Sequence, residues 1–134
     1  MGLCITNLSK NKIMETTIVL VTNTEAVVSE SVINNFLEKT EYCLATFTPR
    51  PHIVCADGFR MSVQAGHGLY SSQDEETGWY NEVEVGYPNQ VEELLIPYTN
   101  GYDDYTDQVY PYTPYEVVDM VIEKHGGLSH IVEY

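Results

Sequence analysis

Residues 61–123 contain no lysine and no arginine, although they make up almost half of a chain of 134 residues. The same stretch holds 13 acidic residues, and the formal charge of the whole chain is −14. Basic side chains supply most of the affinity of proteins for phosphate groups, so this charge argues strongly against direct binding of DNA or RNA. It also disfavours anionic membranes and favours basic protein surfaces.

The chain is long enough for one domain, and 43% of its residues are hydrophobic, which is enough to fill one core. Residues 1–13 are mostly polar in their second half and predict a flexible leader. Residues 14–134 predict a single α+β domain in which a mostly antiparallel sheet packs against two helices. The acidic stretch is too rich in aromatic and β-branched residues to be a disordered tail.

The hydrophobic pattern places the expected elements along the chain. Asp57-Gly58 is a strong signal for a two-residue β-hairpin turn. The second helix has the capping-box sequence Thr113-Pro114-Tyr115-Glu116 at its start and Gly126 at its end. We expect strands at 16–22, 42–47, 53–55, 59–65 and 79–87, helices at 24–39 and from Pro114 to Gly126, and one or two helical turns at 91–96.

Two patterns predict where acidic side chains point. In Glu82-Val83-Glu84-Val85 the residues alternate, which predicts that the valines face the core and the glutamates face solvent. In the second helix, Glu116, Asp119 and Glu123 lie opposite the apolar positions, which predicts an exposed acidic stripe.

Six tyrosines fall within residues 98–115, and acidic residues separate several of them. Such a cluster is typical either of a packed loop or of a binding interface, because tyrosine supplies large contact area at a small cost in entropy. Carboxylates at this density also imitate the phosphates that arginine and lysine side chains bind in nucleic acids. The predicted partner contacts are Glu82, Glu84, Tyr102, Asp103, Asp104, Tyr105 and Asp107.

Enzymatic alternatives have weaker support. Cys43, His52, Cys55 and His67 are possible zinc ligands, but their spacing matches no closed zinc site. Cys55 or Ser62 with a histidine and Asp57 would form a nucleophilic trio, without a turn that positions the nucleophile. Asn100, Asp103, Asp104 and Asp107 are oxygen ligands suited to calcium, but they lack the spacing of a calcium loop. We therefore predict no catalytic residue, no metal and no cofactor.

Several segments together resemble a family of small, acidic, uncharacterised proteins of bacteriophages and prophages. The segments are 57–65, 82–88, 93–98, 109–114, 116–118 and 122–127, so the resemblance covers roughly residues 50–128. That family brings no known catalytic residues. The resemblance implies a phage-type inhibitor of host defence, such as an anti-CRISPR protein, some of which imitate DNA in charge.

The expected function is therefore inhibition of a basic, nucleic-acid-handling protein complex of the host through the acidic, tyrosine-rich face. The chain has no apolar run of the roughly 20 residues that a membrane span requires and no secretory signal pattern, which predicts the host bacterial cytoplasm. A homodimer is possible. The alternatives are a small-molecule-binding protein or small enzyme with its site near Cys55 and His67, and a structural protein of the virion.

Overall fold

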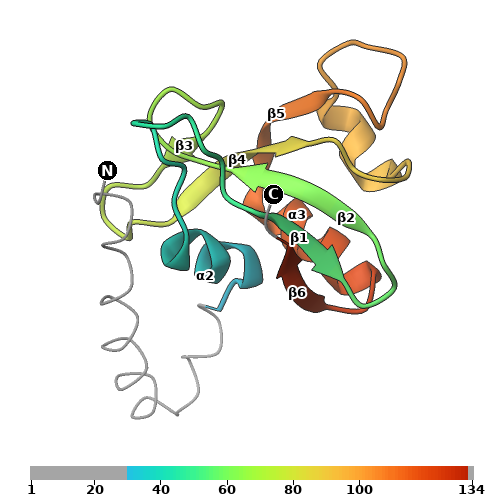
Figure 1. Cartoon of the computed structure of the whole chain (residues 1–134), viewed down its shortest axis with the longest axis horizontal. Helices are drawn as coiled ribbons and strands as arrows, with labels where there is room; N and C mark the ends of the chain where they lie inside the picture. Colours follow the sequence, from blue (N-terminus) through green and yellow to red (C-terminus); the bar gives the residue numbers. More distant parts are fainter. Residues whose placement is uncertain (1–29, 133–134) are drawn as a thin grey trace.

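The computed structural model describes residues 30–132 (Figure 1). The predicted leader at 1–13, the predicted strand at 16–22 and the start of the first predicted helix lie outside these residues. The elements in chain order are α2 (Val32–Lys39), β1 (His52–Cys55), β2 (Arg60–Gln64), β3 (Ser72–Gln73), β4 (Tyr80–Gly86), the 3₁₀ helix η3 (Glu93–Tyr98), β5 (Val109–Pro114), α3 (Tyr115–Lys124) and β6 (Leu128–Val132).

The six strands form one antiparallel sheet, and the two α-helices confirm the predicted α+β class. Strand β4 pairs with β2, β3 and β5, and β1 joins β2 to β6. The Asp57-Gly58 hairpin between β1 and β2 is confirmed, with Gly58 at φ +95°. Figure 1 shows α3 behind the sheet and α2 beside it, and buried side chains of both helices belong to one core cluster with those of the sheet.

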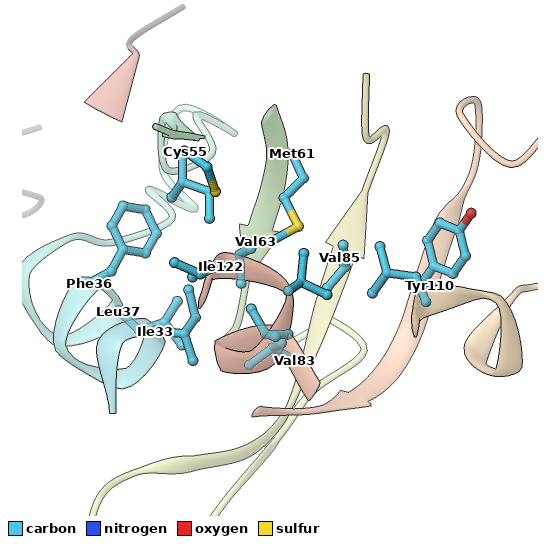
Figure 2. Packing of buried hydrophobic residues seen from close by; sticks show 14 of the residues in the cluster. Ile33, Phe36, Leu37, Cys55, Met61, Val63, Val83, Val85, Tyr110 and Ile122 are labelled. Carbon is cyan, nitrogen blue, oxygen red and sulfur yellow. The ribbon is translucent and has the colours of Figure 1, made fainter. Parts of the chain in front are cut away.

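The core lies between this sheet face and the helices (Figure 2). Val83 and Val85 of β4 are fully buried, as the alternating pattern predicts, and they lie in one cluster with Ile122 of α3. From α2, Ile33 and Phe36 enter the same cluster. The neighbouring glutamates of β4 therefore face the opposite side of the sheet.

Helix α2 begins later than the pattern predicts. Glu30 and Ser31 are not helical, and Ser31 is the N-cap, with its hydroxyl accepting a bond of 3.1 Å from the amide of Asn34. Asp119 of α3 also stabilises the N-terminal end of α2, because its carboxylate accepts hydrogen bonds from the Ser31 hydroxyl and the Ile33 amide, both 2.8 Å. Asp119 is thus half-buried, and its predicted place on an exposed stripe is wrong.

The predicted strand at 42–47 is also wrong. These residues form a turn closed by a single bridge between Cys43 and Thr48, and Phe47 is exposed with a left-handed backbone at φ 55°. Arg50 follows this turn, and its buried guanidinium joins the end of α2 to the residue after β2, because it donates to the carbonyl of Leu37 and, at 2.7 Å, to the carbonyl of Ala65. Burial lowers the pKa of Arg50 to about 10, so the group stays charged near neutral pH.

Strand β5 is absent from the sequence-based prediction because it contains two prolines. Among the strands of residues 30–132 it pairs only with β4, and an edge strand tolerates residues that lack a backbone donor. The strand also replaces the predicted capping box: Pro114 is the N-cap of α3, and the Thr113 hydroxyl donates to the carbonyl of Tyr110 instead.

Helix α3 ends at Lys124, close to the predicted stop. Gly126 follows at φ +92°, a conformation that side chains disfavour, and an added Cβ there would lie 2.9 Å from the Cβ of Ala56. The close approach brings the end of α3 onto the β1–β2 hairpin. No helix within residues 30–132 is long and apolar enough to cross a membrane.

Candidate functional site

The loop between η3 and β5, residues 99–108, projects beyond the sheet (Figure 1). Its conformation is fixed by Gln108, whose side chain is buried. The amide nitrogen of Gln108 donates to the carbonyls of Tyr102 and Asp104, both at 3.0 Å. The amide oxygen accepts bonds from the Thr99 hydroxyl and the Asn100 backbone. The Gln108 side chain thus forms hydrogen bonds with residues in both halves of the loop.

This acidic loop presents the predicted contacts Tyr102, Asp103, Asp104 and Asp107, all exposed. The Asp104 carboxylate accepts bonds from the amide and hydroxyl of Thr106, which lower its pKa and keep it ionised. Asp103 and Asp107 accept no side-chain hydrogen bond from the described residues, so within residues 30–132 their exposed carboxylates have no internal donor. A rigid backbone with free charges is the arrangement that lowers the entropy cost of binding.

Some tyrosines of residues 98–115 are packed inside the protein and others lie on its surface. Tyr110 is fully buried, and its hydroxyl points out of the cluster in Figure 2 and donates to the carbonyl of Tyr105. Tyr102 is 62% exposed and belongs to the surface. Tyr105, a predicted contact, is half-buried, and its carbonyl anchors the loop to the core.

The two predicted contacts on β4 lie on a different element from the loop. Glu82 and Glu84 face away from the core, but both are half-buried rather than fully on a solvent face. Glu82 accepts a bond of 3.0 Å from the hydroxyl of Ser72 on β3. Burial raises the pKa of Glu84. The structure therefore gathers five of the seven predicted residues in the acidic loop and leaves these two on the open face of the sheet.

Most basic side chains of residues 30–132 are already engaged. Arg50 is buried, Lys124 is paired with Glu92 at 2.7 Å, and the Arg60 Nε atom donates to His52 at 3.1 Å. Because these cations are held by the protein itself, they are poorly placed to neutralise the acidic loop. Its negative charge is therefore left exposed to solvent.

A partly buried ionic network lies at the end of α3, and no sequence pattern points to it. The His125 ring bridges two carboxylates, with Nδ1 at 2.7 Å from Asp57 and Nε2 at 2.7 Å from Glu92. Lys124 also reaches Glu92, and the ring stacks on Phe59 with centroids 4.2 Å apart. The sequence shows a histidine at a helix end, where its charge is favourable, but not the two acids that reach it from distant segments.

The network sets the charge of its members. Burial alone would lower the pKa of His125, but its hydrogen bonds to Glu92 and Asp57 raise it above 6.5. Burial alone would raise the pKa of Glu92, yet the bonds from Lys124, Leu94 and His125 lower it. The bond from His125 lowers the pKa of Asp57. Asp57, Glu92 and His125 are therefore charged together in mildly acidic solution, and the network joins the β1–β2 hairpin, η3 and α3.

We expect the free energy of unfolding to fall as the pH rises above 6.5. A histidine whose folded pKa is raised stabilises the fold below its unfolded pKa, and this contribution disappears as the pH passes the folded value. Urea unfolding of the wild type and of His125→Phe at several pH values measures this. The decline above pH 6.5 should be absent from the variant. An equal decline in both proteins would assign it to another group.

The alternative site near Cys55 and His67 is not assembled. Cys55 ends β1 beside the hairpin turn, whereas His67 lies beyond the opposite end of β2. The length of β2, at about 3.3 Å per residue, therefore separates the two residues. Cys55 is a free, buried cysteine, and burial and Asp57 raise the pKa of its thiol to about 11, which opposes nucleophilic reactivity. Within residues 30–132, no group of three or more His, Cys, Asp or Glu side chains is arranged to hold a metal ion.

Comparison with protein-family models, with curated proteins and with solved structures finds no match to this chain. The resemblance of residues 50–128 to phage proteins therefore stays a prediction. Functional conclusions rest on the chain's own geometry.

Proposed function

We propose that this protein inhibits a basic, nucleic-acid-handling protein complex of a bacterial host by occupying its nucleic-acid-binding surface, in the manner of an anti-CRISPR protein that imitates DNA. The observation that carries the proposal is the acidic loop at residues 99–108, held rigid by Gln108, with exposed Asp103, Asp104 and Asp107. Such a complex is found in the bacterial cytoplasm, which is therefore the compartment proposed for this protein.

Three features support this function over catalysis. The acids of the loop have no basic neighbour in the sequence between residues 61 and 123. Tyr102 adds exposed aromatic area beside them, as is common at the energetic centres of protein interfaces. The ionisable side chains around His125 are paired with one another and join three elements of the fold, so they do not form an open site.

A competition experiment tests the proposal. A purified CRISPR nuclease complex is mixed with fluorescent target DNA, and DNA binding is followed by anisotropy while this protein is added. We expect stoichiometric loss of DNA binding and a slower association rate at high salt, because screening weakens electrostatic steering. Simultaneous binding of DNA and protein would contradict occupation of the nucleic-acid surface. Absence of binding across a panel of such complexes would overturn the proposed function.

A further inference from the structure

The face of the sheet opposite the helices contains a hollow of about 430 Å³. Its lining comes from strands β1, β2, β4 and β5 and from the loops that follow α2 and β2. Tyr42, Leu69 and Tyr87 contribute aromatic and apolar surface, and Glu84 faces the hollow from β4. The hollow is thus an apolar concavity with a carboxylate in its lining.

Glu84 is the acidic group that lines this hollow. Its carboxylate accepts no hydrogen bond from any residue of 30–132. The neighbouring Gln64, by contrast, has hydrogen bonds at both ends of its amide group. It accepts one from the Arg50 amide and donates to the Arg50 carbonyl and the Ser62 hydroxyl. A half-buried carboxylate without a donor loses hydration without compensation, and a cationic ligand would restore that compensation.

The backbone around Glu84 is also unusual. In the pairing of β4 with β5, Val83 faces Thr113 and Val85 faces Tyr110, so two residues of β5 lie opposite Glu84 alone. One of the two is Tyr112, which has a left-handed backbone at φ 49°. Tyr87, in the lining of the hollow, has φ 50°. Both rings are about half exposed. A bulge of this kind re-aims side chains. The Tyr112 ring packs on Tyr70, whereas Tyr87 lies with Glu84 in the lining of the hollow.

We propose that this hollow binds the guanidinium group of an arginine side chain from a protein partner, with Glu84 accepting its hydrogen bonds and Tyr87 packing against its plane. Arginine fits better than lysine, because its planar group both pairs with a carboxylate through two bonds and stacks on aromatic rings. The chain's charge of −14 favours a basic partner in the same sense. The choice of partner rests on the proposed function, whereas the site itself does not.

The test uses a blocked Gly-Arg-Gly peptide and the full-length chain. Titration is followed by backbone amide NMR shifts, and the neutral isostere citrulline replaces arginine in a control peptide. We expect shifts centred on Glu84, Gln64 and Tyr87, and affinity about tenfold weaker in Glu84→Gln, which removes the charged acceptor. Glu93→Gln is the matched control, since it removes the same charge at an exposed position outside the hollow, and its affinity should stay within about twofold of the wild type.

Equal weakening by both substitutions would overturn the site and assign binding to net charge. Equal binding of the citrulline peptide, shifts confined to the acidic loop, or no measurable binding would overturn it as well. If the protein did not compete with DNA but still bound the arginine peptide at Glu84, only the proposed function would be overturned.

Discussion

Replacement of Glu92 by alanine is expected to lower the free energy of unfolding by about 3–5 kcal/mol, the usual cost of removing one partner from a buried ionic pair. The side chain of Glu92 is 1% exposed. Its two oxygens bind His125 and Lys124 at 2.7 Å, and one of them also caps η3 through the amide of Leu94. The loss is a large fraction of the 5–15 kcal/mol typical of a domain.

Glu93→Ala is the matched control for this prediction. Glu93 has the same side chain and is the next residue along, but it is exposed and has no side-chain hydrogen bond within residues 30–132. Its replacement should change stability by no more than about 0.5 kcal/mol, as is usual at the surface. Urea unfolding measures both variants. If Glu92→Ala lay as close to the wild type as Glu93→Ala, the network around His125 would not be a staple of the fold.

The part of the fold that follows from local patterns was predictable. The alternation around Val83 and Val85 locates β4 and its buried face, and Asp57-Gly58 locates the first hairpin. Both signals depend only on neighbouring residues and on the two-residue period of a strand.

The elements that were missed or misplaced depend on distant contacts. Strand β5 forms because it pairs with β4 at the edge of the sheet, where the missing backbone donors of its two prolines are tolerated. The start of α2 depends on Asp119, 86 positions away from Ile33. Thr113, at the expected cap position, bonds Tyr110 instead, since β5 continues to Pro114. Local propensity contains none of this information.

The candidate site shows the same division. The count of acids and the absence of basic residues over 61–123 identify a negative surface from sequence alone. The separation of Glu82 and Glu84 from the acidic loop, and the burial of Tyr110, follow from strand pairing and packing. The role of Gln108 as the anchor of the loop was not predictable either, because its hydrogen-bond partners are backbone groups and a threonine hydroxyl, which no sequence motif marks.

The most direct test of the central claim is the affinity of the triple variant D103N/D104N/D107N for a nuclease complex whose DNA binding the wild type blocks. These substitutions preserve size and keep the Asp104 oxygen that bonds Thr106, so the loop should retain its shape. The matched control is D74N/E75Q/E76Q, which removes three charges from the loop between β3 and β4, where Glu75 and Glu76 are exposed. We predict affinity about 100-fold weaker for the first variant and little changed for the second. Equal affinities for the two variants would contradict a specific role for the acidic loop.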